Sequence, residues 1–249
     1  MTSVLSSLEK RLVALDKKTF YRWLRQGMPG SAFLRYAGGY IFWFLYAGRP
    51  YVGTRVAEIP WVMKRLKEHG AGKCTLLIVG DVLTQKLAGM GYGVDLVDMD
   101  AEASSGKNLR VQKLDIREAK LPAAGSDLAI AISTLEHIGV QGIEFPDGDR
   151  LAMGIIHRAL KPGGLLLLTV PFGKAHVVKG FTRVYDRQSL LKILSEYFTV
   201  EEETYRVWNG IRWKRAPVAA VETAGFLRND PEKYKGQNLG LAMVMAKNK

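Results

Sequence analysis

The sequence is poor in cysteine and has no long apolar run, and both absences narrow the class of protein. Its 249 residues include one cysteine, Cys74, so the chain has no intrachain disulfide and no thiolate cluster for zinc or iron–sulfur. The longest apolar run, residues 36–48, has 13 residues with three glycines, whereas a bilayer span needs about 20 apolar residues. No signal peptide is recognisable. We therefore expect a cytoplasmic protein without a transmembrane segment, with peripheral membrane contact as the alternative.

Acidic residues are few relative to basic ones, above all near the N-terminus. The formal net charge is +12, and residues 1–75 carry 13 Lys or Arg but 4 Asp or Glu. A basic segment favours an anionic partner such as nucleic acid, lipid headgroups or a phosphorylated substrate. A solvated basic face without a partner is the alternative. No nucleic-acid-binding module is recognisable, so nucleic acid is the less favoured partner.

The length and composition fit one large domain with an appended part, because 47% of the residues are hydrophobic and 24% are charged. Apolar residues at three-to-four spacing predict helices at 3–27, 31–47 and 56–68. We expect residues 1–72 to form an N-terminal helical extension. The aromatic-rich helix at 31–47 is either core or a hydrophobic lid over a site.

The rest of the chain, residues 73–249, alternates short apolar runs with amphipathic helices, which predicts an α/β domain with a doubly wound sheet. We expect residues 172–183 to be a loop and residues 208–236 to be an irregular insertion. The expected strands are 75–79, 93–97, 109–114, 127–132, 165–170, 198–207 and 239–246, and the main helices are 150–160 and 189–197.

Residues 74–100 are the centre of this domain, since they read as a strand, a tight turn, a short helix and a second strand. The second strand ends at Asp98. A carboxylate at that position can accept hydrogen bonds from the two hydroxyls of a ribose. The stretch therefore predicts a nucleoside-containing cofactor at the carboxyl edge of a parallel sheet.

Two segments further along resemble the class I S-adenosylmethionine-dependent methyltransferases. Asp127-Leu-Ala-Ile-Ala-Ile-Ser-Thr-Leu-Glu-His-Ile-Gly139 looks like the fourth strand of that family and its following loop. His157-Arg-Ala-Leu-Lys-Pro-Gly-Gly-Leu-Leu-Leu-Leu-Thr-Val-Pro171 looks like its helix, Lys-Pro-Gly-Gly turn and fifth strand. The resemblance covers about 175 residues, from about residue 74 to the C-terminus, and leaves the first 70 or so unexplained.

The resemblance implies a Rossmann-like sheet of seven strands in the order 3-2-1-4-5-7-6, with S-adenosylmethionine lying across the carboxyl ends of strands 1 to 4. Carried over residue by residue, Asp98 would hold the ribose hydroxyls, and Glu136 would bind the amine of the cofactor or close a turn. The remaining cofactor contacts would be Gly80 and Asp81 after the first strand, Asp115 and Ile116 at the adenine, and Ser133 and Thr134 at the methionine.

The first loop departs from the family pattern, which has an acidic residue two positions before the first glycine and then Gly-x-Gly-x-Gly. Here Ile78 stands at the acidic position, and Gly80 is followed by Asp81, Val82, Leu83 and Thr84. Glycines at such a turn let the backbone approach a ligand closely. Their absence leaves open whether this loop binds the methionine moiety.

Two histidines follow neighbouring expected strands, where a base for methyl transfer would lie. His137 follows the fourth strand and His176 the fifth, and an imidazole suits a base at neutral pH. The alternatives are a structural turn for His137 and an exposed loop position for His176. Four scattered histidines and one cysteine give no metal-ligand spacing, so we expect no metal.

The sequence therefore predicts an S-adenosylmethionine-dependent methyltransferase acting on a small or carrier-linked acceptor, which its basic charge suggests is anionic. The glycine-poor first loop motivates one alternative, a catalytically silent methyltransferase-like domain with a binding or scaffolding role. Charge alone motivates another, an RNA methyltransferase.

Overall fold

The computed structural model describes residues 53–69, 74–78, 83–101, 105–141, 144–224 and 239–249. The predicted helices at 3–27 and 31–47 lie outside these residues. The predicted helix at 56–68 is confirmed as α4, Arg55–His69. None of the helices in the described part of the chain is long and apolar enough to cross a bilayer.

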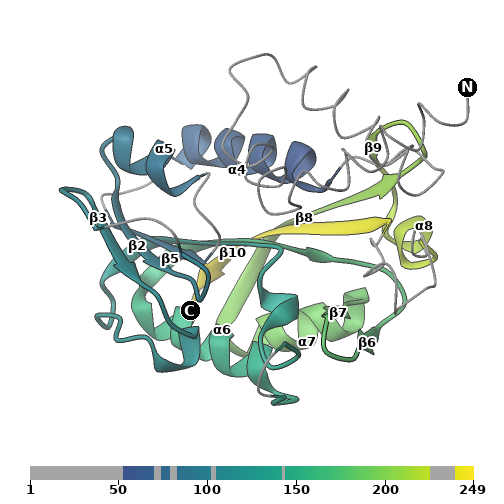
Figure 1. Cartoon of the computed structure of the whole chain (residues 1–249). Helices are drawn as coiled ribbons and strands as arrows, with labels where there is room; N and C mark the ends of the chain where they lie inside the picture. Colours follow the sequence, from purple (N-terminus) through teal and green to yellow (C-terminus); the bar gives the residue numbers. More distant parts are fainter. Residues whose placement is uncertain (1–52, 70–73, 79–82, 102–104, 142–143, 225–238) are drawn as a thin grey trace, which may run out of the picture.

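A sheet in the order β3-β2-β1-β4-β5-β10-β8-β9 forms the middle layer, with α4 and α5 over one face and α6 and α7 over the other (Figure 1). A separate hairpin, β6-β7, lies beside α7 (Figure 1). The strands are β1 Cys74–Ile78, β2 Gly93–Val97, β3 Leu109–Gln112, β4 Ser126–Ile132, β5 Leu160–Pro171, β6 His176–Val178, β7 Thr182–Val184, β8 Phe198–Trp208, β9 Trp213–Arg215 and β10 Gly240–Asn248. The helices after α4 are α5 Thr84–Gly89, α6 Gly148–Ala159, α7 Arg187–Tyr197 and α8 Val218–Glu222, and two 3-10 turns are η1 Ile116–Glu118 and η2 Leu135–His137.

Strand direction makes the sheet mixed. β3, β2, β1, β4 and β5 pair in parallel, so their carboxyl ends share one edge. β10 pairs antiparallel with both β5 and β8. Parallel strands covered on both faces are expected to be continuous apolar runs, and residues 128–132 of β4 are all buried.

Two predictions about irregular segments were wrong. Over the described residues the sheet has eight strands rather than seven, because β9, within the segment expected to be irregular, pairs with β8. Trp213 of β9 is buried against Trp208 of β8, with ring centroids 5.9 Å apart, which holds this short edge strand in place. The segment 172–183, expected to be a loop, contains β6 and the first residues of β7.

Each face of the sheet has its own hydrophobic core. Under α4 and α5, Trp61, Val62 and Leu87 pack on β4 and β10. On the opposite face, α6 and α7 pack on β5, β8 and β10 through residues that include Ile156 and Leu194. Asp186 caps α7, since its side chain accepts a hydrogen bond from the Ser189 N–H at 2.8 Å.

The end of β10 is fixed by one buried side chain. The Asn248 amide donates to the carbonyl oxygens of His157, Leu160 and Lys161 at 3.1, 3.1 and 3.2 Å. These carbonyls lie where α6 ends and β5 begins, so one amide satisfies acceptors that the helix end leaves unpaired. Asn248 Oδ1 also lies 2.7 Å from Nδ1 of His157, which gives this histidine a structural role.

The turn after η2 depends on two glycines that touch each other. Gly139 has φ +73°, and a Cβ there would lie 2.1 Å from the Phe145 carbonyl oxygen. A Cβ on Gly148 would lie 2.8 Å from the Gly139 Cα. The close approach brings the start of α6 against the segment that follows β4, and so fixes the direction in which η2 leaves the sheet.

This contact gives a first prediction. Gly163 also has φ +73°, but a Cβ there meets nothing within 4 Å. We expect Gly163→Ala to lower the free energy of unfolding by about 1 kcal/mol, the cost of the left-handed conformation for an L residue. Gly139→Ala should cost at least about 3 kcal/mol, because overpacking adds to that strain. Denaturant unfolding measures both; equal losses would contradict the close approach.

Candidate functional site at the carboxyl edge of the sheet

Most of the predicted site residues that are described follow the carboxyl ends of parallel strands. Asp98 follows β2, Asp115 lies three residues after β3, and the segment 133–137 follows β4. Because β3, β2, β1 and β4 are successive parallel neighbours, these positions share one edge of the sheet. Gly80 and Asp81 lie outside the described residues.

Ser133, the first residue after β4, has a strained backbone. Its φ is +42°, an uncommon conformation for a residue with a Cβ. Its N–H donates to both the carbonyl oxygen and Oγ1 of Thr169 in β5, at 2.9 and 3.0 Å. Strain of this kind persists where the surroundings hold it, and it is concentrated at functional sites.

A carboxylate that the sequence analysis missed, Glu58 of α4, holds this strand end. Its side chain is fully buried. Oε1 accepts hydrogen bonds from Ser133 Oγ and from Thr169 Oγ1, the latter at 2.7 Å. Oε2 accepts from Arg55 Nη1 at 3.0 Å, and the same Nη1 donates to the Ile132 carbonyl at 2.8 Å. The first turn of α4 is thus bound to the ends of β4 and β5.

Only weak signals in the sequence could have located these residues. Thr169 is the single hydroxyl in the apolar run 165–170, where every other side chain is Leu or Val. Glu58 is an acidic residue in a segment that is mostly basic. Neither signal says that residues separated by 111 positions make contact.

Glu136, in η2, is a buried carboxyl group with an unpaired oxygen. The residue is 1% exposed, and its Oε2 has no hydrogen-bond partner among the described residues. Burial, followed by the negative charge of Glu58, raises the pKa of Glu136 to about 8, although its own backbone hydrogen bond and the Arg55 charge act in the opposite direction. At neutral pH the group is therefore mostly a neutral acid.

His137, the next residue, has its tautomer fixed by a carbonyl group. Its Nδ1 lies 2.7 Å from the Phe181 carbonyl oxygen and 3.0 Å from Nε2 of Gln141, which donates to the same carbonyl; because the carbonyl can only accept and is the nearer group, we place the proton on Nδ1. Nε2 is then the basic nitrogen, and it lies 3.8 Å from Glu136 Oε1. The side chain is 33% exposed, so a proton on Nε2 can pass to water.

The hairpin that presents Phe181 is held by a buried ion pair. Arg183 Nη1 lies 2.9 Å from Asp149 Oδ2, and Nη2 donates to the Pro146 carbonyl at 2.8 Å. Tyr185 donates to the same Asp149 oxygen at 2.9 Å, and burial raises its pKa well above the ordinary value. Through these contacts β7 is fixed to α6, and the orientation of the His137 ring follows.

His176 is placed differently from His137. It is exposed at the start of β6, its Nδ1 lies 2.7 Å from the Lys174 carbonyl, and it pairs with Val184 in the hairpin. Phe181, which contacts His137, is at the turn end of the same hairpin. His176 therefore lies at the open end of the hairpin and His137 contacts its turn end, and the strand residues between the two ends are spaced by about 3.4 Å each.

The expected nucleoside positions differ in how their polar groups are used. Asp98 Oδ1 accepts from the Asp100 N–H at 2.8 Å, which closes the turn after β2. The Asp115 oxygens accept from Arg117 Nε and Nη2 at 3.0 and 2.7 Å, and these bonds lower the pKa of Asp115. Ile116 is buried in the core under α6. Thr134 Oγ1 donates to the Ile132 carbonyl at 3.1 Å.

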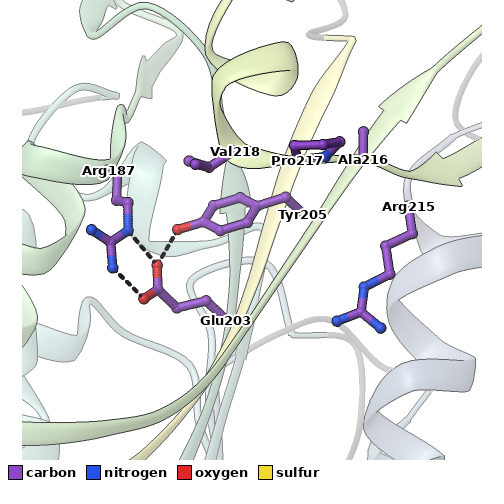
Figure 2. A pocket seen from close by; sticks show the side chains of 7 residues that line it. All are labelled: Arg187, Glu203, Tyr205, Arg215, Ala216, Pro217 and Val218. Atoms are coloured by element: carbon purple, nitrogen blue, oxygen red, sulfur yellow. Dashed lines mark hydrogen bonds and ion pairs between the residues drawn. The ribbon is translucent and has the colours of Figure 1, made fainter.

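A cavity of about 610 Å³ lies elsewhere, between β8, β9, α7 and α8. Figure 2 shows Arg187 and Tyr205 both directed at Glu203, while Arg215 lies apart from them on the right of the view. Arg187 binds the Glu203 carboxylate at 2.8 and 2.9 Å, and the Tyr205 hydroxyl donates to it. None of the predicted site residues lines this cavity. Arg187, Glu203 and Tyr205 thus satisfy one another, which suits a structural contact.

The fold is that of the class I S-adenosylmethionine-dependent methyltransferases. The chain is similar over 90% of its length to the Burkholderia thailandensis 1,6-didemethyltoxoflavin N1-methyltransferase, solved with bound 1,6-didemethyltoxoflavin and S-adenosylhomocysteine; the match covers 93% of that chain with 14% identity and a TM-score of 0.50. It is also similar to an S-adenosylmethionine-dependent methyltransferase from Mesorhizobium loti, over 77% of this chain and 97% of that one, with 14% identity and a TM-score of 0.51. No protein-family model matches the sequence, and neither does any curated protein.

The buried Glu136 gives a prediction about stability and pH. Its folded pKa, about 8, lies above the ordinary value of 4.5, so its contribution to stability is full below about pH 4.5 and is lost as the pH rises towards 8. Relative to Glu136→Gln, the wild type should lose about 3 kcal/mol between pH 5 and pH 8. Urea unfolding at several pH values measures this loss.

The control is Glu144→Gln, which removes an exposed carboxylate from the loop after η2. Its free energy of unfolding should follow the wild-type dependence on pH. If Glu136→Gln also runs parallel to the wild type from pH 5 to pH 8, then Glu136 is not protonated in the folded protein.

Proposed function

We propose that this protein is an S-adenosylmethionine-dependent methyltransferase that acts on a small or carrier-linked acceptor. The observation that carries the proposal is the polar carboxyl edge of β2, β3 and β4 in a sheet with the methyltransferase fold. In an open α/β sheet, ligands bind outside the carboxyl ends of the strands, where the strand order reverses. Here the order reverses between β1 and β4.

The cofactor contacts that we propose follow that edge. Asp98 binds the ribose hydroxyls with its carboxylate, whose Oδ1 also accepts from the Asp100 N–H. Ser133 and Thr134 line the methionine side, and the contacts expected of Gly80 and Asp81 fall outside the described residues. At the adenine, Asp115 is already paired with Arg117 and Ile116 is buried in the core, so this position contributes through its backbone.

The chemistry that we propose is an in-line displacement. The acceptor atom attacks the methyl carbon of the sulfonium, the carbon–sulfur bond breaks with its electron pair going to sulfur, and the acceptor loses a proton. His137 Nε2 takes that proton, because Nδ1 is already protonated and bound to the Phe181 carbonyl. His176 is exposed and belongs to the far end of the hairpin, so we assign it no role in proton transfer.

The alternatives lack comparable support. The silent-domain alternative rests on the first loop, whose residues 79–82 lie outside those described. The RNA alternative rests on net charge, and an electrophoretic shift that is absent even at low salt would remove it, because phosphate contacts dominate such affinity.

Binding of the cofactor tests the proposal directly. Calorimetry with S-adenosylmethionine and S-adenosylhomocysteine should give dissociation constants on the micromolar scale, near −8 kcal/mol. Asp98→Ala should weaken both by at least about tenfold, because two hydroxyls lose a charged acceptor. If neither compound binds to the folded protein, the proposed methyltransferase activity is refuted.

Asp100→Ala is the matched control for the ribose contact. It removes an exposed carboxylate from the same turn, while the Asp100 N–H that binds Asp98 is retained. Its affinity should equal that of the wild type. Equal weakening in both variants would mean that net charge, rather than a ribose contact, determines the affinity.

A further inference from the structure

Arg55, Glu58, Ser133 and Thr169 form a hydrogen-bonded cluster at the ends of β4 and β5, and the Glu136 carboxyl group is close enough for the charges of this cluster to shift its pKa. Glu58 is satisfied, since it accepts from Arg55, Ser133 and Thr169. The charges of the same two residues act on Glu136, because Glu58 raises its pKa and Arg55 lowers it. With both carboxyl groups ionised, the cluster would hold one uncompensated negative charge away from water, which is costly.

The unsatisfied oxygen of Glu136 is the second observation. Its Oε2 is buried and has no hydrogen-bond partner. An unmade hydrogen bond on a buried polar atom costs about 1–3 kcal/mol, so each such atom calls for an explanation. Glu136 also lies three residues beyond the strained Ser133. A ligand atom that pairs with Oε2 accounts for the cost.

We propose that Glu136, supported by Glu58, forms a buried binding site for a cationic ligand group, an ammonium or a sulfonium. The cation binds next to Oε2, Glu136 ionises, and the carboxyl proton leaves for water. One proton is thus exchanged for one positive charge. The cofactor and a basic nitrogen acceptor are two sources of such a group, and in naming them the inference rests on the proposed function.

The charged groups around Glu136 leave room for this exchange. From α4 they are Glu58 and Arg55, which neutralise each other through a direct ion pair. His137 of η2 approaches Oε1 rather than Oε2. Asp149 of α6 and Arg183 of β7, the elements packed against η2, pair with each other at 2.9 Å. From the described residues, a ligand cation would therefore meet no excess of positive charge at Oε2.

Two partly exposed side chains give the cluster a connection to solvent. The Arg55 side chain is 42% exposed, and its guanidinium reaches the buried Glu58 carboxylate from outside. The His137 side chain is 33% exposed and lies 3.8 Å from Glu136 Oε1. The His137 ring is thus placed to carry the released proton from the buried carboxyl to water.

The test counts the protons released on binding. Calorimetry at pH 7 in buffers of different ionisation enthalpy is run for wild type, Glu136→Gln and the control Glu144→Gln. The first two titrants are S-adenosylmethionine and S-adenosylhomocysteine. The other two are n-propylamine and its neutral isostere n-propanol, each titrated with and without S-adenosylhomocysteine present. Wild type and Glu144→Gln should release about one proton more than Glu136→Gln on binding the cation.

The pattern identifies the source of the cation. If wild type releases more protons than Glu136→Gln with both cofactor forms, the site binds the cofactor ammonium. If it does so with S-adenosylmethionine alone, the site binds the sulfonium. An excess with n-propylamine, absent with n-propanol, assigns it to an amine acceptor. The apparent affinity for that cation should rise about tenfold from pH 6 to pH 7 in wild type and stay flat in Glu136→Gln.

Two failures remain distinguishable. If both cofactor forms bind but no titrant releases more protons from wild type than from Glu136→Gln, the cation site is refuted and the methyltransferase proposal stands. If neither cofactor form binds, the methyltransferase proposal fails, and n-propylamine added to the protein alone still decides the cation site. Glu136→Gln should fold, because it replaces a neutral acid by a neutral amide; circular dichroism verifies this.

Discussion

The arrangement of the carboxyl edge depends on one buried carboxylate. Glu58 takes hydroxyl donors from the ends of β4 and β5, and it is paired with Arg55 one turn earlier in α4. A buried carboxylate is tolerated only where its oxygens are satisfied, so this geometry has few alternatives. It sets where α4 begins over the sheet, while apolar packing by Trp61, Val62 and Leu66 holds the rest of the helix.

The same carboxylate connects structure to chemistry. Its charge raises the pKa of Glu136, and its hydrogen bond to Ser133 Oγ helps hold the strained residue from which η2 departs. On the other side of η2, the Arg183–Asp149 pair fixes the hairpin whose Phe181 carbonyl selects the tautomer of His137. The two acid–base groups of the site are thus set by elements on opposite faces of the sheet. Neither face alone could set both.

The positions of most strands and helices could be predicted from the sequence, because the information is local. The run at 93–97 and the Asp186 cap of α7 are patterns within a few residues, and the structure has both. The hairpin at 176–184 was missed because its strands have three residues each, too few for an alternation to be visible. β9 was missed for the same reason, since only its contact with β8 identifies it as a strand.

The residues of the candidate site also divide into those with a local sequence signal and those without one. Asp98, Ser133 and His137 could be located because each follows a recognisable strand. Glu58 could not, since the bond to Thr169 spans 111 positions and no periodicity records it. The protonation of Glu136 was equally out of reach, because it depends on burial and on Glu58 and Arg55, which are distant in the chain. The anionic acceptor was inferred from the net charge of the whole sequence. The charged groups described at the site, Glu58, Glu136 and Arg55, include more carboxyl groups than cations.

The place of β10 in the sheet has a consequence for synthesis on the ribosome. β10 follows β8 and β9 in the chain, yet it lies between β5 and β8 and pairs with both. Until residues 240–248 have left the exit tunnel, β5 presents an open edge, and the β8–β9 hairpin has no place in the sheet. The nascent chain therefore exposes two unpaired strand edges until residues 240–248 are available, a period in which pairing with another chain competes with folding.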